Sequence, residues 1–358
     1  MRTTTRQTQR GLSLVELMIA VSLSLVLTLG VIEIFAASKQ SNRVQVALGQ
    51  LQDNARFALD TLTHDIRMAG MVGCSSKLIS KIKNKSMAND TDGGYLADMG
   101  DGIEKGYGIE GYRDLGNAAF SINLYKGHEF NQSNTSDNTD IIVVKHASAK
   151  SFSIIETNGT KTNITVKGDF DITNGAPLLV SDCDNADIFT AGIPAKTKDG
   201  GVVTKTVIPT NQALSKKYGT SAEAHELEYS IYYIKEDNGT NNLYKTIVTK
   251  SGNAAATSST PIAQGIEDID ILYGLNIGTE NKTKYVYADY MGSDGATPID
   301  WESVSSVRIT LVMSTPENNT ALKDQKYWLN GKEQSVGGKK IFRAFTTTIA
   351  LRNKDLDS

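Results

Sequence analysis

A long apolar segment near the N-terminus is the strongest pattern in the sequence. The stretch from Leu17 to Ile32 contains no charged residue, and the apolar composition continues as far as Ala37. At about 1.5 Å per residue, a helix from Leu12 to Ala37 would span roughly 39 Å, which is enough to cross a bilayer. The pattern therefore predicts a membrane-spanning helix over residues 12–37.

The helical period continues past the apolar segment, but on one face only. Apolar residues recur at three- and four-residue spacing, while polar residues fill the other faces. We expect a single helix from Leu12 to Ala69, ended by Gly70 and Gly73, whose second half (residues 38–70) packs on the chain's own globular domain. A free-standing coiled-coil dimer is the alternative, although the stripe has little more than the minimum length for one. The stripe consists of Val44, Leu48, Leu51, Ala55, Leu59, Leu62, Ile66 and Ala69.

From Asp140 onward the pattern changes to the two-residue period of β-strands. Ile141–Val144 is a β-branched run, and Asn158-Gly159 and Asn238-Gly239 are turn dipeptides that predict hairpins. A helix followed by mostly antiparallel strands predicts an α+β fold. Alternating apolar positions predict three strands with a buried face, marked by Leu227, Tyr229, Ile231 and Tyr233, by Val307, Ile309, Leu311 and Met313, and by Ile341, Phe345, Ile349 and Leu351.

A glycine-rich region lies between the predicted helix and these strands. Residues 75–138 are poor in apolar side chains and predict loops and short strands. Gly106, Gly108 and Gly111 match the spacing of a dinucleotide-binding fingerprint, but no apolar strand precedes them and no clear helix follows, so the context of that motif is absent. We therefore expect a β-rich globular domain over residues 71–358, without a bound cofactor.

The amino-acid composition excludes several classes of function. The chain has 37 Lys and Arg against 40 Asp and Glu, so its bulk charge argues against nucleic-acid binding. Two cysteines are too few for a disulfide-dense scaffold or a four-cysteine zinc site. The G-x-S-x-G and H-E-x-x-H motifs do not occur, and we expect no catalytic residues and no metal. We expect solvated turns, rather than EF-hand calcium sites, at two acidic patches, Asp182, Asp184 and Asp187, and Asp90, Asp92, Asp98 and Asp101.

Basic residues precede the apolar segment, and an acid lies within it. Arg2, Arg6 and Arg10 occur without a compensating acid, so the N-terminal end is expected in the cytoplasm. Residues 1–11 do not begin a secretory signal peptide, because the apolar segment that follows is too long and ends without a cleavage site. A carboxylate in a membrane segment costs about 2.5–3.5 kcal/mol, so we expect Glu16 either to have a partner or to extend to the membrane interface.

A cut after Gly11 would supply that partner. It would free an α-amino group on Leu12, about one helical turn from Glu16. In an array of like helices, this cation could neutralise the Glu16 carboxylate of a neighbouring subunit. Loss of residues 1–11 would leave 34 basic residues against 40 acidic ones, so the exported chain would carry a net charge of −6.

This N-terminal pattern resembles a known processing signal. A short basic leader, Gly11 and then Leu-Ser-Leu-Val-Glu-Leu-Met-Ile-Ala is similar to the prepilin signal of type IV pilins and of type II secretion pseudopilins. The resemblance implies that a prepilin peptidase cuts between Gly11 and Leu12 and N-methylates Leu12. It also implies that Glu16 acts in subunit assembly. Most pilins carry Phe at the new N-terminus, so Leu12 is a departure, although an apolar one.

The rest of the chain resembles the PilW family of type IV pilus minor pilins. Cys74 and Cys183 both lie inside matching stretches, which supports their pairing. From the residues alone, one disulfide in an exported domain and two free buried thiols both stay open. The stretches are LTHDIRMAGMVGC (62–74), PLLVSDCDNADIF (177–189), GIEDIDILYG (265–274), WESVSSVRITLV (301–312) and TIALRN (348–353).

The resemblance implies structural work rather than catalysis. By this resemblance, the chain would act with other minor pilins to initiate pilus assembly and would lie at the pilus tip. It would thereby support pilus biogenesis, twitching motility and adhesion. The implied partners are the prepilin peptidase, other minor pilins, the major pilin, the assembly platform and the inner membrane. The precursor would span the inner membrane once, with a cytoplasmic leader and a periplasmic body, before reaching the pilus tip at the cell surface. The alternatives are a minor pseudopilin of a type II secretion system and a membrane-anchored periplasmic enzyme or binding module that keeps residues 1–11.

Overall fold

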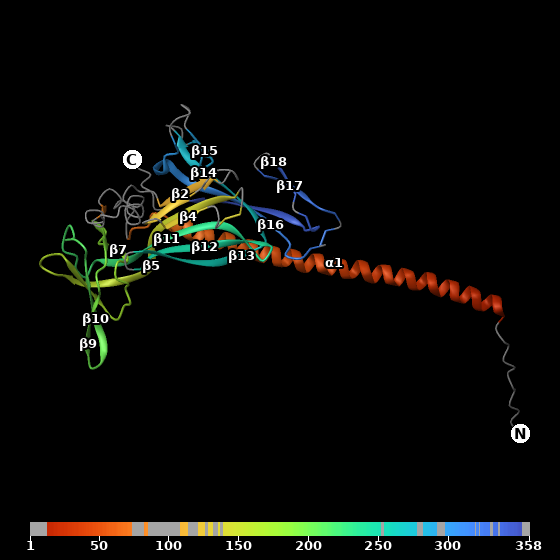
Figure 1. Cartoon of the computed structure of the whole chain (residues 1–358), viewed down its shortest axis with the longest axis horizontal. Helices are drawn as coiled ribbons and strands as arrows, with labels where there is room; N and C mark the ends of the chain where they lie inside the picture. Colours follow the sequence, from red (N-terminus) through yellow and green to blue (C-terminus); the bar gives the residue numbers. More distant parts are fainter. Residues whose placement is uncertain are drawn as a thin grey trace, which may run out of the picture.

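One long helix and a body rich in β-strands make up the computed structural model (Figure 1). This arrangement confirms the α+β fold expected from the sequence, with mostly antiparallel strands. The structure describes residues 13–73, 82–84, 108–113, 121–125, 128–131, 135–136, 139–251, 254–277, 282–291, 298–318, 320–321, 323–329, 332–335 and 337–352.

The helix α1 spans Leu14–Met68, 55 residues in all. The predicted single helix is thus confirmed over its described length. Gly70 and Gly73, which were expected to end it, have φ angles of 70° and 114°, a left-handed region that glycine adopts without strain. The first half of α1 projects from the body (Figure 1). Counted from the N-terminus, Ala47 is the first buried residue of α1.

Two sheets form the body in the described part of the chain. The larger has eleven strands, eight of them in the order β1-β8-β7-β11-β5-β6-β10-β9. In addition, β2 pairs with β5, β12 pairs with β11, and β13 pairs with β12. The smaller has the order β15-β14-β16-β19. Two hairpins, β3-β4 and β17-β18, stand apart from both sheets. The strands are β1 Ile82–Asn84, β2 Ile109–Arg113, β3 Ser121–Tyr125, β4 His128–Asn131, β5 Asp140–Thr157, β6 Asn163–Lys167, β7 Pro177–Ser181, β8 Ala186–Thr190, β9 Ala195–Asp199, β10 Val202–Pro209, β11 Glu223–Asp237, β12 Thr240–Ser251, β13 Ala254–Gln264, β14 Ile266–Ile277, β15 Lys282–Val286, β16 Val304–Ser314, β17 Lys326–Leu329, β18 Lys332–Ser335 and β19 Phe342–Ala350.

Both hairpins predicted from Asn-Gly dipeptides are present, with different turns. Asn238 and Gly239 join β11 to β12 and have φ angles of 53° and 76°, as a two-residue type I′ turn requires. The connection from β5 to β6 is longer. There the Asn158 side chain accepts hydrogen bonds from the backbone N–H groups of Thr162 (2.8 Å) and Asn163 (3.1 Å). Asn158 therefore supports this loop through its side chain.

The central strand β11 is buried on both faces. The four predicted positions, from Leu227 to Tyr233, pack in one core. Tyr232 and Ile234, which alternate with them and face the other way, pack in a second core beneath α1. The sequence pattern identified the first face correctly. It did not reveal the second, because that face is covered by a helix distant in sequence.

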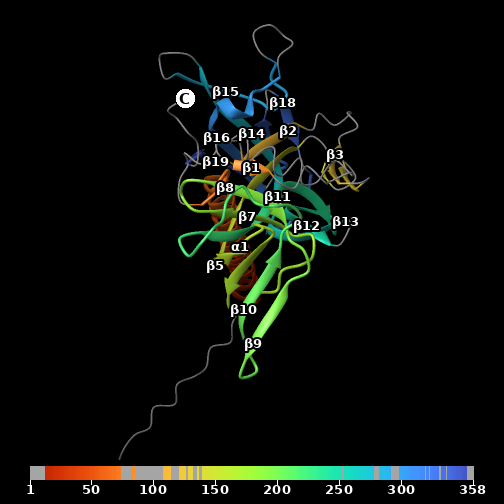
Figure 2. The same ribbon diagram turned by 90° about the vertical axis from the view of Figure 1, so that its left-hand side faces the viewer.

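The amphipathic half of α1 fills this second core. It contacts β5 and β13 of the larger sheet and β16 and β19 of the smaller one, and Figure 2 shows it nearly end-on behind strands of the body. The prediction that the stripe packs on the chain's own body is therefore confirmed. Val44, Leu48 and Leu59 lie at the edges and are half-buried, while two small residues absent from the predicted stripe, Ala47 and Ala58, are buried.

An ionic cluster fastens the end of α1 to the larger sheet. Asp65 accepts hydrogen bonds from the hydroxyl of Tyr232 on β11 and from Lys245 Nζ on β12, the latter at 2.7 Å. Lys245 also lies 2.8 Å from the Glu228 carboxylate. Burial alone would raise the pKa of Asp65, but the hydrogen bonds from Lys245 and Tyr232 outweigh it and lower that pKa overall.

Replacing Asp65 by asparagine should destabilise the fold, because it removes one partner of a buried ion pair. We expect Asp65→Asn to lower the free energy of unfolding by about 3 kcal/mol. Asp60→Asn is the matched control, since Asp60 makes only a surface pair with Arg56 worth less than about 0.5 kcal/mol. Denaturant unfolding of the detergent-solubilised full chain measures both. Equal stability of the two variants would contradict the role given to Asp65.

Candidate functional site

The candidate assembly site lies where α1 begins. Ser13 is the N-cap residue. Its Oγ accepts a hydrogen bond from the backbone N–H of Glu16 (3.2 Å), and the Glu16 carboxylate accepts one from the backbone N–H of Ser13 (3.1 Å). This reciprocal capping box gives partners to two N–H groups that an apolar medium would otherwise leave unpaired.

The capping box is a feature that the sequence analysis missed. The spacing Ser13-x-x-Glu16 before an apolar run is its signature, and that signal was available in the sequence. Glu16 is exposed and directed toward the N-terminal end of α1. Gly11 and Leu12, the predicted cleavage and methylation residues, lie outside the described residues.

The apolar half of α1 is exposed all around its circumference. Its large apolar side chains, from Leu14 to Phe35, are 55–76% exposed. By length and composition this helix is able to cross a membrane. A continuous apolar cylinder of this length is unstable in water, so it requires lipid or other apolar helices around it. This is consistent with membrane anchoring and with pilus association.

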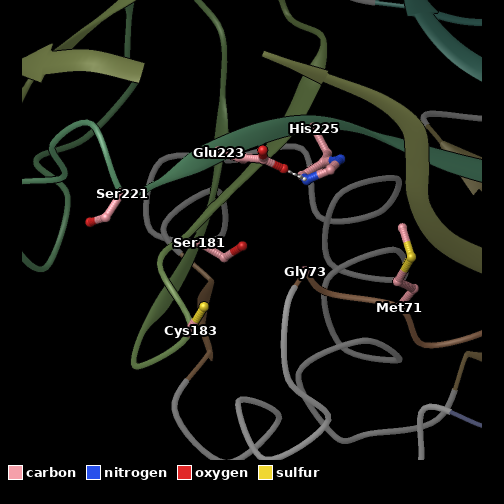
Figure 3. Close-up of a pocket in the computed structure, with 7 residues that line it drawn as sticks. All are labelled: Met71, Gly73, Ser181, Cys183, Ser221, Glu223 and His225. Atoms are coloured by element: carbon pink, nitrogen blue, oxygen red, sulfur yellow. Dashed lines mark ion pairs between the residues drawn. The ribbon is translucent and has the colours of Figure 1, made fainter. Parts of the chain in front are cut away.

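Cys183 lies beside the chain that leaves the end of α1. Cys183 follows β7 and lines a cavity of about 450 Å³ together with Gly73 and Ser181 (Figure 3). A Cβ atom on Gly73 would collide with the Ser181 hydroxyl, so the chain leaving α1 passes directly against the end of β7. No cysteine in the described part of the chain is free. Cys74 lies outside that part, so its bridge to Cys183 stays a prediction.

Two acids of the patch that follows β7, Asp182 and Asp187, accept hydrogen bonds from other parts of the chain. Asp182 accepts a hydrogen bond from Lys216 Nζ at 2.5 Å and another from the Asn185 backbone N–H at 3.0 Å. The expectation of solvated turns was wrong for Asp187, which is fully buried and accepts hydrogen bonds from Ser215 and Tyr218. The second patch, from Asp90 to Asp101, lies outside the described residues.

Two acids of the ionic cluster and a neighbouring histidine have ligand atoms close enough together to share a metal ion. They are Asp65, His146 and Glu228. The ammonium of Lys245 already lies between the two carboxylates, 2.7 Å from Asp65 and 2.8 Å from Glu228. This lysine supplies the positive charge that a metal ion would bring.

The glycines of the apparent fingerprint serve close packing instead. Gly111 lies within β2, where a Cβ atom would collide with the Tyr273 ring of β14. Gly108 lies against the backbone of Gly70 at the end of α1. Gly106 lies outside the described residues. A strand follows Gly108 where a dinucleotide-binding motif needs a helix.

A pair of buried acids was not apparent from the sequence. Burial raises the pKa of Asp140 to about 7. Burial and the nearby Asp140 carboxylate raise the pKa of Asp268 on β14 to about 8. Asp140 accepts a hydrogen bond from the Ile271 backbone N–H at 2.8 Å, which links the start of β5 to the smaller sheet.

Two family models match the chain. Residues 6–32 match the prokaryotic N-terminal methylation motif, and residues 231–353 match the type IV pilus-assembly protein W (PilW) family. No curated protein and no solved structure matches the chain. A methylation motif leading into a long helix, with an antiparallel β-rich body, defines a type IV pilin-like protein.

The resemblance to the PilW family is confirmed by these matches, and the chain carries a PilW domain. That domain runs from β11 to just beyond β19, and so includes the smaller sheet and the β11-β12 hairpin that hold α1. The two matches support a role as a type IV pilus minor pilin. The methylation motif implies processing by a prepilin peptidase and partners from the pilus system.

The raised pKa values of Asp140 and Asp268 predict a stability that falls as the pH rises. Each carboxyl group is protonated more readily when folded than when unfolded, so its contribution is complete below the unfolded value of 3.8 and is lost as the pH passes about 7 and about 8. We expect a lower melting temperature at pH 8.5 than at pH 5. Asp268→Asn, which stays neutral, should reduce this difference, while exposed Asp199→Asn should not. An unchanged difference in Asp268→Asn would contradict this account.

Cys74→Ser should lower the melting temperature of the full chain if the two cysteines are bridged. A bridge that closes a loop of about 100 residues contributes up to roughly 4–5 kcal/mol in the chain-entropy model. Thermal unfolding with and without reductant measures the effect, and the variant should not respond to reductant. An equal melting temperature of the unaltered chain with and without reductant would contradict the bridge.

Proposed function

We propose that this protein is a minor pilin that helps to initiate type IV pilus assembly and lies at or near the pilus tip. One observation carries the proposal. A single helix bears a methylation motif and an apolar, exposed first half, and its second half is fastened into a body that carries a PilW domain. This design suits a subunit that moves from a bilayer into a bundle of like helices without unfolding.

Processing comes first in the proposed sequence of events. The prepilin peptidase removes residues 1–11 by cutting between Gly11 and Leu12, and then methylates Leu12. Residues 12–37 form the membrane and filament-core helix, residues 38–70 its amphipathic half, and residues 71–358 the globular domain. The positive charge of the new N-terminus then meets the Glu16 carboxylate of an adjacent subunit.

The geometry at Glu16 supports this pairing. The capping box directs the carboxylate toward the N-terminal end of α1, close to where the new amine would lie. The box supplies hydrogen bonds but no positive charge. A charged carboxylate in the membrane costs about 2.5–3.5 kcal/mol, and a neighbouring amine would offset this cost and set the axial register between helices.

The size and charge of the body favour a place at the tip. A body of this size fits a cap better than a repeated unit of a thin shaft. A net charge of −6 after processing argues against nucleic acid as a ligand. The proposed partners are other minor pilins, the major pilin and the assembly platform, and the proposed role is structural, supporting twitching motility and adhesion.

A minor pseudopilin of a type II secretion system is the second candidate. The methylation motif at residues 6–32 favours it equally, since both systems use such a signal. The genes beside this one, from a pilus or a secretion operon, discriminate between the two. A membrane-anchored periplasmic module would instead keep Met1, which mass spectrometry of the N-terminus detects.

Glu16→Ala should leave processing intact and reduce surface pili roughly tenfold, because the neighbouring amine then lacks its counter-charge. Glu33→Ala, in the same helix and equally exposed, is the matched control and should keep its pili. Sheared pili are quantified, and N-terminal mass spectrometry confirms processing in both variants. Unchanged piliation in Glu16→Ala would contradict the charge pairing, and a mature chain that does not begin at Leu12 would overturn the proposal.

A further inference from the structure

One side of the body lies very close to the point where α1 would leave the membrane. Gln40 donates a hydrogen bond to the Thr320 carbonyl (3.1 Å), and Arg43 pairs with Glu317 (3.2 Å). These two helix residues come shortly after Ala37, the end of the apolar segment, at roughly 5 and 9 Å along the helix axis. When α1 crosses a bilayer over its apolar segment, Glu317 and Thr320 are therefore expected within about 10 Å of the bilayer surface.

The β17-β18 hairpin is fixed to this segment. The Ala321 N–H bonds to the Lys339 carbonyl (2.7 Å), and the Lys339 N–H bonds to the Asp324 carboxylate (2.9 Å). The Tyr327 ring of β17 packs 5.3 Å from the Phe342 ring at the start of β19. Figure 1 shows the hairpin on the side of the body from which the exposed half of α1 projects.

The hairpin exposes a large aromatic side chain, and its sequence has more lysines than acids. Trp328 on β17 is 70% exposed, whereas the other tryptophan, Trp301, packs edge-on against Tyr273. Residues 323–340 contain five lysines against two acids, although the processed chain has a net charge of −6. Of the lysines whose side chains the structure describes, Lys323, Lys326 and Lys339 are exposed, and Lys326 pairs with Glu333 at 3.0 Å.

An exposed tryptophan in the hairpin, with exposed lysines before and after the hairpin, is suited to a membrane interface. The indole ring favours the headgroup region, and lysines are attracted to anionic headgroups. The position of the hairpin adds to this chemistry, since α1 tethers it beside the bilayer. Tethering converts a weak surface contact into an intramolecular one with a high effective concentration.

We propose that the β17-β18 hairpin docks on the surface of the membrane that α1 crosses, with Trp328 in the headgroup region and Lys323 and Lys339 on anionic lipid. This inference rests on the membrane anchoring in the proposed function. Docking holds the body against the bilayer before assembly and fixes the tilt of α1. Entry into a filament then requires the hairpin to leave the lipid.

Brominated lipids, which quench tryptophan fluorescence on contact, test the docking directly. The full chain is reconstituted into vesicles with Trp301→Phe, so that Trp328 is the sole tryptophan. Anionic brominated lipid should quench at least half of its emission and shift the remainder to shorter wavelength. Trp328→Phe, in which only Trp301 emits, should show little quenching.

Charge variants separate lipid attraction from simple proximity. Lys323→Gln with Lys339→Gln should reduce quenching at least twofold in anionic vesicles. Lys198→Gln with Lys205→Gln, on the exposed β9-β10 hairpin at the other end of the body, should leave it unchanged. Resistance to alkaline extraction confirms that α1 is inserted in every sample.

Two results would overturn the inference. One is unquenched Trp328 emission while α1 is inserted, and the other is shielding of Trp328 only after other pilin-like subunits are added, which would make the hairpin a protein interface. Both are read without any pilus being formed. They are therefore distinct from a failure of the proposed function, which the Glu16→Ala piliation assay reports.

Discussion

The fastening of the second half of α1 to both sheets is the constraint on which the rest of the structure depends. Apolar contacts along the buried stripe supply most of the attachment, and the cluster of Asp65, Tyr232 and Lys245 fixes its end. Because α1 is continuous from Leu14 to Met68, the orientation of the body follows directly from that of the exposed half. Any force on the body is thus transmitted to the exposed apolar segment.

The same helix serves two different surroundings, and its sequence reflects both. Up to Phe35 apolar side chains cover the whole circumference, and from Val44 they are concentrated on the face toward the body. This change of pattern made the helix, its end at Gly70 and its packing partner predictable. The period-two pattern and the Asn238-Gly239 turn likewise identified the strands and hairpin that pack beside it.

The buried charged residues that were not predicted from the sequence have a common physical cause. Asp65 lies among apolar stripe residues, and only the approach of Lys245, 180 positions later in the chain, explains a carboxylate there. The burial of Asp187 and the paired acids Asp140 and Asp268 arises in the same way, from contacts between distant strands. Hydrophobic periodicity identifies which face of a strand is buried, but it does not say which strand will lie beside it. The Ser13–Glu16 cap is different, since it is a local motif.

Among the residues that the structure describes, the cap engages only one carboxylate oxygen of Glu16. The backbone N–H of Ser13 bonds to Oε2, and the second oxygen keeps its lone pairs for another donor. A cation from an adjoining helix can therefore approach without uncoiling the first turn. When α1 enters a bundle of helices, a charged neighbour would replace solvent or lipid beside Glu16, and when it leaves, the reverse would happen. The helix end keeps the same shape in both steps, which favours reversible growth over permanent attachment.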